Sequence, residues 1–282
     1  MNISKDRPNY QYILLRFLMP MVVVLFIPLL SHAETSTQKP TVRAFVYTEV
    51  QNSVPFDQVP WKIRNPIISS QPGFISKTWL SGLGNNSVGG FYSFDSLENA
   101  QKYVTEFFPS GARKQDTGHT TRIFDAVVVE EASRDMKSAH FGSNLSTKPE
   151  AFVYTELQIN IPFTKVPWKK RNPIIKKEPG LLSKTWLSGV NTNTVGGIYA
   201  FDTIENAKHY ALVSFPKTAK KMNVSMYIRI FDARVVEEAS RGMNSPFFTS
   251  QIQNNVLNNS EQSKNKFISF GGECIKFTRT ER

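Results

Sequence analysis

An internal repeat constrains the fold of this chain more than any other sequence feature. KTWLSGLGNNSVGGFYSFDSLENA begins at Lys77, and KTWLSGVNTNTVGGIYAFDTIENA begins at Lys184, an offset of 184 − 77 = 107 positions. The same offset holds without a gap from Ala44 to Arg134, and more than half of these positions are identical to their partners. Solenoid repeats have periods of about 20–50 residues, so a period near 100 indicates a duplicated small domain.

Each copy is expected to contain four strands and two helices. In the first copy we predict a strand over 43–50, a helix capped by Asp57 that Pro66 kinks or divides, strands over 74–82 and 88–95, a helix over 97–108 capped by Asp95 or Ser96, and a strand over 121–131. The order βαββαβ is that of the ferredoxin-like unit, which has a four-stranded antiparallel sheet with helices on one face.

Both faces of the predicted sheet are apolar. Phe45 and Tyr47 point to one face and Val46 to the other, and Phe91 and Tyr92 are likewise on opposite faces. A sheet with one wet face would alternate between apolar and polar residues. The second copy is the natural cover for the second face. The predicted fold class is therefore α+β, with two ferredoxin-like βαββαβ repeats packed sheet to sheet as an intramolecular α/β-barrel pseudo-dimer.

The N-terminus has the features of a secretory signal. Lys5, Arg7 and Arg16 precede the apolar stretch FLMPMVVVLFIPLL, and SHA follows, so cleavage is expected after Ala33. The apolar stretch is shorter than the roughly 20 residues that span a bilayer. We therefore predict an exported protein, periplasmic or secreted. The predicted organisation is a signal peptide (1–33), an N-terminal linker (34–42), the first repeat (43–142), a linker (143–149), the second repeat (150–249) and a polar C-terminal tail (250–282) that contains the single cysteine, Cys274.

Positive charge is concentrated in the second repeat. Residues 43–142 hold ten basic and ten acidic residues, whereas residues 150–250 hold fourteen basic and eight acidic ones. This excess indicates either a solvated basic face or weak contact with an anionic surface such as lipid head groups. Nucleic acid is not an expected partner of an exported protein. The remaining partner predictions are a small apolar or aromatic ligand and a monomeric state.

The usual catalytic motifs are missing from the sequence. His119, His140 and His209 have no histidine at the matching position of the other copy, and no His/Cys/Asp/Glu spacing is typical of a metal site. No Ser-His-Asp or Cys-His set is suggested. Gly89–Gly90 indicates a bulge or a close backbone approach, because no GxGxxG and no strand-to-helix transition accompanies it.

The pattern PGFISKTWLSG…VGGFYSFDSLENAQKY…RIFDA resembles the YdhR-type monooxygenases of the dimeric α/β-barrel superfamily. The resemblance covers nearly all of each copy but neither the signal nor the tail. Members are usually single domains that dimerise into the barrel, whereas both halves are fused here. The resemblance implies oxygenation of a small aromatic or polyketide-like substrate without a cofactor: no bound metal and no flavin.

Such a reaction needs an enclosed aromatic pocket, a group that deprotonates a phenol or enol, and donors that stabilise the oxyanion. The candidate pocket residues are Trp61, Arg64, Asn65, Trp79, Tyr92 and Arg122 in the first copy and Trp168, Arg171, Asn172, Trp186, Tyr199 and Arg229 in the second. Lys77 and Lys184 are further candidate donors, with snorkelling to solvent as the alternative. The aromatic candidates could instead be core packing. The alternative function is a non-catalytic ligand-binding or surface-interaction protein on the same fold.

Overall fold

The computed structural model describes residues 40–248, and the two copies contain the same elements. The first repeat comprises β1 (Ala44–Val50), α1 (Trp61–Ser69), β2 (Phe74–Ser81), β3 (Val88–Phe94), α2 (Leu97–Lys102), α3 (Phe108–Arg113), β4 (His119–Asp125) and α4 (Glu130–Asp135). The second comprises β5 (Ala151–Gln158), α5 (Trp168–Ile175), β6 (Leu181–Ser188), β7 (Thr194–Phe201), α6 (Ile204–His209), α7 (Phe215–Met222), β8 (Met226–Asp232) and α8 (Glu237–Arg241). The predicted βαββαβ order is confirmed in both, with α4 and α8 as additions.

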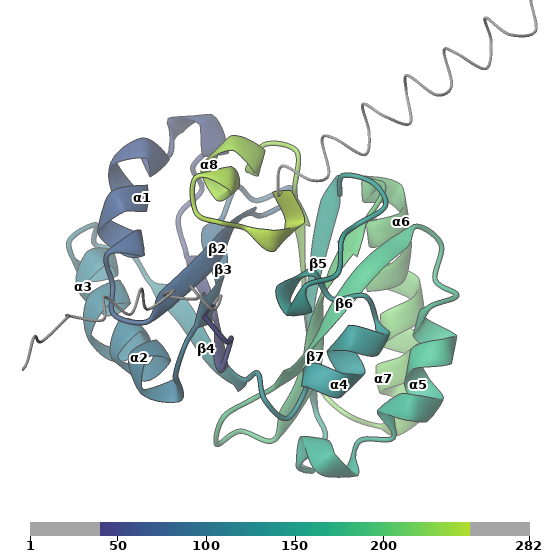
Figure 1. Cartoon of the computed structure of the whole chain (residues 1–282). Helices are drawn as coiled ribbons and strands as arrows, with labels where there is room; N and C mark the ends of the chain where they lie inside the picture. The colour runs from purple at the N-terminus through teal and green to yellow at the C-terminus, as the bar shows by residue number, and fades with distance from the viewer. Residues whose placement is uncertain (1–39, 249–282) are drawn as a thin grey trace, which may run out of the picture. The chain divides into compact units, whose positions relative to one another are not determined.

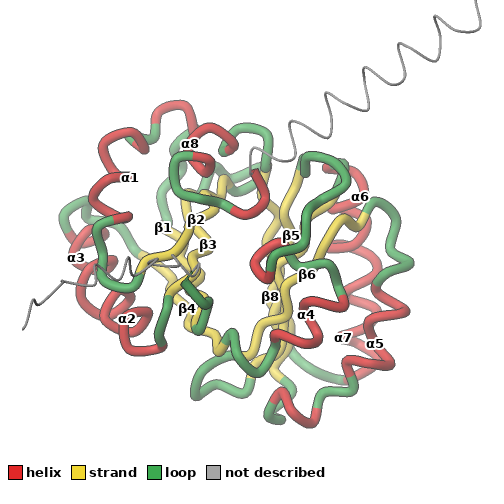
Figure 2. Tube along the Cα trace, in the orientation of Figure 1, coloured by secondary structure: helices red, strands yellow, loops and turns green. Residues whose placement is uncertain are grey.

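Each repeat forms one antiparallel sheet, in the order β2-β3-β1-β4 or β6-β7-β5-β8. Helices cover one face of each sheet, and the two sheets face each other (Figures 1 and 2). At one seam Gly82 bridges Phe231, and at the other Phe124 bridges Gly189. The eight strands thus form the two halves of a barrel within one chain, which confirms the predicted pseudo-dimer architecture.

Aromatic side chains fill the space between the sheets. At its centre the ring of Tyr47 stacks on the ring of Tyr154, with centroids 4.1 Å apart and planes at 5°. Both rings are fully buried. A buried, parallel pair of this kind holds the two repeats in register. It also stabilises the fold by removing apolar surface from water.

The last part of each repeat packs against the other repeat. We define residues 127–141 as the first arm and residues 234–248 as the second arm. The first arm contains α4, which lies beside α5 of the second repeat, and the second contains α8, which lies beside α1 of the first (Figure 1). Lys184 N donates to Met136 O at 3.1 Å, and Lys77 N donates to Met243 O at 2.9 Å. Each repeat is therefore completed by the arm of the other.

The sequence prediction of a strand over 121–131 was wrong, and the error conceals the first arm. β4 ends at Asp125, whose carboxylate accepts hydrogen bonds from Val127 N at 2.8 Å and Val128 N at 3.3 Å. An aspartate that binds the backbone two residues ahead turns the chain, in preference to a strand that its valines would favour. Pro66 does not divide the helix, since α1 continues through it to Ser69.

A π-helical turn interrupts the long helix on each sheet. In the second repeat this turn spans Tyr210–Ser214 between α6 and α7, and Phe215 N donates to Tyr210 O, five residues back. Pro216 follows at the start of α7. Because proline has no N–H and its ring clashes with the carbonyl four residues earlier, it favours this wider turn. The turn sets which residues of the helix face the sheet.

Several sequence predictions fall outside the described residues. They are the signal peptide, its cleavage site after Ala33, the C-terminal tail and Cys274. Within residues 40–248, no helix combines the length and the apolar character needed to cross a bilayer.

Candidate functional site

Lysine, tryptophan and tyrosine form a row on the helix-covered face of the second sheet. Lys184 and Trp186 are two apart on β6, and Lys184 pairs with Tyr199 on β7, so all three side chains point to the same face. Lys184 Nζ lies 2.8 Å from the centroid of the Trp186 ring and 4.9 Å from that of Tyr199. A Cβ on Gly197 would lie 2.7 Å from Lys184 Cε. The second glycine of the GG pair therefore makes room for the lysine.

The Lys184 side chain is almost completely removed from solvent, with 1% of its surface exposed. The alternative of snorkelling is therefore wrong. Burial, with a smaller contribution from the Arg171 guanidinium, lowers the pKa of Lys184 well below its usual value. No carboxylate pairs with its amine in the described part of the chain. Lys184 is thus a desolvated amine that readily gives up its proton.

The Trp186 indole is fixed by the first arm. Trp186 Nε1 donates to Asn172 Oδ1 at 2.9 Å, and Asn172 Nδ2 donates to Ala132 O at 3.0 Å and to Asp135 Oδ2 at 2.8 Å. Trp186 N also donates to Ser133 Oγ at 2.9 Å. The indole N–H is therefore already satisfied. Trp186 supplies a flat aromatic wall, and we correct its predicted role as a hydrogen-bond donor to a substrate.

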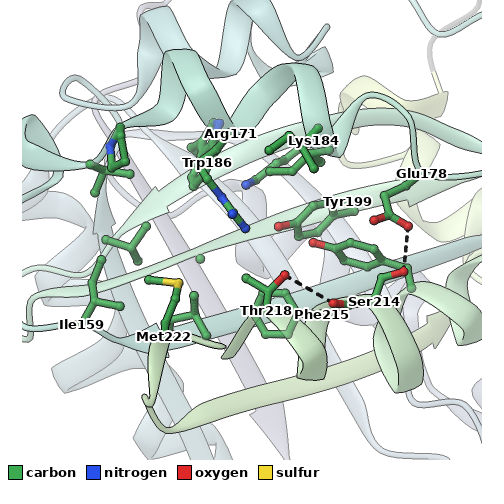
Figure 3. A pocket seen from close by; sticks show the side chains of 18 of the residues that line it. Ile159, Arg171, Glu178, Lys184, Trp186, Tyr199, Ser214, Phe215, Thr218 and Met222 are labelled. Atoms are coloured by element: carbon green, nitrogen blue, oxygen red, sulfur yellow. Dashed lines mark hydrogen bonds between the residues drawn. The ribbon is translucent and has the colours of Figure 1, made fainter. Parts of the chain in front are cut away.

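A cavity of about 310 Å³ lies between this row and helices α5 and α7 (Figure 3). Ligand pockets have volumes of about 300–1,000 Å³, so this one suits a small molecule. Its walls are mostly apolar, with Arg171, Lys184, Tyr199 and Tyr210 among the polar groups. Burial raises the pKa of Tyr199 to about 12, so its phenol keeps the proton and can donate a hydrogen bond.

Glu178 and Ser214 form a polar contact at one end of the cavity. Ser214 Oγ, at the end of the π-helical turn, donates to Glu178 Oε2 at 2.9 Å (Figure 3). Both residues line the pocket and are half-buried. This pair joins the turn before α7 to the segment after α5, and so holds the two helical walls of the cavity together.

The predicted site residues do not all meet at this cavity. Arg171, Trp186 and Tyr199 line it, and Asn172 lies behind Trp186. The first repeat brings together the equivalent residues: Trp79 Nε1 donates to Asn65 Oδ1 at 2.9 Å, and Lys77 Nζ lies 2.8 Å from the Trp79 ring. Tyr92 also belongs to this first-repeat set, since Lys77 Nζ lies 5.0 Å from the centroid of its ring. Burial raises the pKa of Tyr92, and the Arg64 charge opposes that rise.

Arg122 and Arg229 must be removed from the predicted pocket. Arg229 Nε donates to Glu49 Oε2 at 3.0 Å, and Arg122 Nε lies 3.4 Å from Glu156 Oε1. These ion pairs connect the repeats on the barrel side of the sheets, because each glutamate also accepts a hydrogen bond from the stacked tyrosine two residues before it. The arginines stabilise the inter-repeat interface and do not face the cavity.

Trp61 and Trp168 occupy the first positions of α1 and α5. Both are half-buried and pack against the edge of the core. Trp168 is absent from the walls of the cavity.

Sequence reasoning missed Tyr210, Ser214 and Glu178. Tyr210 lies in the helix that Thr203 caps. Its spacing from Thr203 could have placed its side chain on the helix face that points to the sheet. Ser214 and Glu178 carry no signal of their own, because each differs from its partner in the first repeat, Phe107 and Gln71. Among residues 40–248, no group of three His, Cys, Asp or Glu side chains is arranged to hold a metal ion.

Comparison with known families gives a match to most of each repeat. The family described as "Putative mono-oxygenase ydhR" matches residues 64–133 and 156–245. None of the curated proteins matches the sequence.

Solved structures show a more distant likeness. An anthrone oxidase-like protein has 12% identity and a TM-score of 0.45, over 70% of this chain and 92% of its own. A "putative monooxygenase" from Lactobacillus acidophilus has 7% identity and a TM-score of 0.37, over 67% and 93%. A chlorite dismutase mutant from Candidatus Nitrospira defluvii has 10% identity and a TM-score of 0.40, over 71% and 96%. Nothing about the activity of this chain follows from these likenesses.

Proposed function

Because the chain belongs to the ydhR mono-oxygenase family, we propose that its second-repeat pocket oxidises a small aromatic phenol or enol with molecular oxygen. For a phenol with a free ring position, the balanced reaction is phenol + O₂ → quinone + water. One oxygen atom enters the product and the other leaves as water. The substrate supplies all four electrons, so the proposed reaction requires no external reductant.

The observation that carries the proposal is the Lys184 amine, buried against the cavity with no carboxylate partner among residues 40–248. Phenols reduce oxygen much more readily as phenolates, so the first requirement is a base that removes the hydroxyl proton. A lysine whose pKa is lowered by burial is neutral more of the time and can accept that proton. The resulting pair, an ammonium and a phenolate, attract each other in the low-dielectric cavity.

Other groups of the cavity stabilise or position the phenolate once it forms. The Arg171 guanidinium, which lines the cavity, adds a second positive charge near the developing anion. Tyr199 keeps its proton and can donate a hydrogen bond. Trp186 provides the aromatic wall against which a ring can stack. The apolar remainder of the walls excludes water, which strengthens the attraction between the phenolate and the two positive groups.

Oxygen uptake with 1-naphthol and a panel of related phenols tests this proposal. We expect Lys184→Met to lower kcat/KM at least about 100-fold, since a positioned base contributes 10²–10⁴-fold. Lys77→Met is the matched control, because Lys77 occupies the equivalent position and is equally buried. We expect this control to retain most of the activity.

The ligand-binding alternative gives a different result. If 1-naphthol raises the melting temperature of the parent chain while no phenol of the panel supports oxygen uptake, the pocket binds aromatic ligands without oxidising them, and the enzyme proposal is wrong. Equal loss in Lys184→Met and Lys77→Met would contradict the assignment to the second repeat alone.

A further inference from the structure

Two apolar side chains at the mouth of the second-repeat cavity are exposed to solvent. Ile174 of α5 and Met222 of α7 both line the cavity, yet 56% and 43% of their surfaces are exposed. Ile174 lies on α5 and Met222 on α7, which both contribute residues to the wall of the cavity. Figure 1 shows the two helices, and Figure 3 shows Met222. The opening is therefore bordered by apolar groups that nothing covers within residues 40–248.

Exposed lysines flank these two side chains. Lys170 lies one helical turn before Ile174, and Lys177 lies three residues after it. On α7, Lys217 and Lys221 form the row next to the one that faces the cavity. None of these four lysines forms an ion pair with another described residue. Glu178 is the one acidic residue among the cavity walls, and it is bonded to Ser214.

The first repeat lacks this combination. The residues equivalent to Lys170, Lys177, Lys217, Lys221, Ile174 and Met222 are Ile63, Ser70, Ser110, Lys114, Ile67 and Gln115. Only one of the four lysines and one of the two apolar side chains is kept. The concentration of positive charge in the second repeat is thus partly a local feature of the cavity mouth.

We propose that this mouth, defined by Ile174, Met222 and the four lysines, docks on the surface of an anionic lipid bilayer. Lysines near a membrane are attracted by anionic head groups, and exposed apolar side chains enter the boundary between head groups and acyl chains. A nucleic acid would satisfy the lysines but would leave Ile174 and Met222 without an apolar partner. A bilayer satisfies both kinds of group. The cavity would then open toward the lipid, where small apolar molecules concentrate.

Co-sedimentation of the full chain with vesicles tests the docking surface. The vesicles are phosphatidylcholine alone or an equal mixture with phosphatidylglycerol, each at low and physiological salt. We expect binding to the mixed vesicles only, weakened by salt. Lys177→Ser combined with Lys217→Ser installs the first-repeat residues and should weaken binding at least about tenfold, because each lysine near the surface contributes roughly fivefold.

Two further variants make the test specific. Ile174→Ser combined with Met222→Gln should weaken binding several-fold at unchanged charge, and undiminished binding would overturn bilayer docking in favour of simple charge attraction. Ile67→Ser combined with Lys114→Ser makes the equivalent change in the first repeat and should have no effect. A loss as large in this control as in the lysine variant would also overturn the proposal. The docking surface does not rest on the proposed reaction, so Lys184→Met should bind vesicles like the parent chain.

Discussion

The two repeats share the lysine, tryptophan and tyrosine of the sheet but differ in what surrounds them. In the second repeat, Ser214 leaves space and bonds to Glu178. In the first, Phe107 takes the position of Ser214, and its ring lies 5.2 Å from that of Tyr103. Duplication preserved the residues that build the core face, while the residues that border a cavity diverged.

The hydrogen-bond network around the asparagine that holds the tryptophan also differs between the repeats. Asp135 of the first arm accepts a hydrogen bond from Asn172 and pairs with Lys176 Nζ at 2.7 Å. The equivalent residue in the second arm is Gly242, which cannot offer a carboxylate to Asn65. Together the differences support the proposal that the second repeat carries the site and the first mainly completes the barrel.

The largest effect is expected from replacing Ser214 by the residue at the matching position of the first repeat. Ser214→Phe should place a ring in the cavity and weaken the binding of 1-naphthol about 100-fold, measured by calorimetry. Ser214→Ala removes the bond to Glu178 without filling the cavity and is the matched control, with an expected loss of about threefold, or roughly 0.7 kcal/mol. If Ser214→Phe binds as well as Ser214→Ala, the ligand does not occupy this cavity.

A stability measurement should show where the repeats are still equivalent. Lys77 and Lys184 are equally buried, and burial lowers the pKa of each well below its usual value. Between the folded and the unfolded pKa, the unfolded chain binds more protons than the folded one, so the free energy of unfolding rises with pH. The rise is complete only above the unfolded lysine pKa of about 10.4.

Replacing either buried lysine by methionine should therefore stabilise the protein at pH 7 by about 1–3 kcal/mol, since an apolar side chain replaces an unpaired amine. The gain should shrink as the pH approaches 10. Urea unfolding at pH 7 and 9.5 measures both quantities. A variant that is less stable than the parent at pH 7 would mean that the amine has an interaction partner that offsets its burial.

The smallest effect is expected from the carboxylate that the first arm supplies. Lys176 and Asn172 hold the pKa of Asp135 below its usual value, so it is ionised at neutral pH. Asp135→Ala should reduce kcat/KM for oxygen uptake by about three- to tenfold, because Asn172 and the Trp186 indole lose one anchor. A shift in the tryptophan emission should accompany the loss. Glu131→Ala, on the same helix, is the control and should change neither; equal effects would assign the result to α4 stability.

Regular alternation made the sheets predictable from the sequence. The two-residue spacing of Lys77 and Trp79 placed both side chains on one face, and the apolar character of both faces required a second sheet. The face on which Arg122 lies could not be predicted in this way. Alternation fixes which residues share a face but not which face is covered by helices. Only the pairing of β4 with β1, which sets Arg122 opposite Tyr47, resolves it.

The cavity and the arms could not be predicted in the same way. The position of Ser214 depends on a π-helical turn, which breaks the 3.6-residue period on which helix faces are assigned. The first arm begins in the segment Val127–Val129, whose composition favours a strand, while a single carboxylate turns the chain. Contacts between segments so distant in sequence leave no local pattern.

The exchanged arms have a consequence for the order in which the protein forms during synthesis. At the edge of β2, Lys77 N donates its hydrogen bond to Met243 O, and Met243 is 243 − 77 = 166 residues farther along the chain. At about 5–20 residues per second, a ribosome needs roughly 8–30 seconds to add them. The first half therefore emerges with one strand edge open for that interval. It cannot reach its final state as an independent unit, and closure of this edge must wait for the second arm.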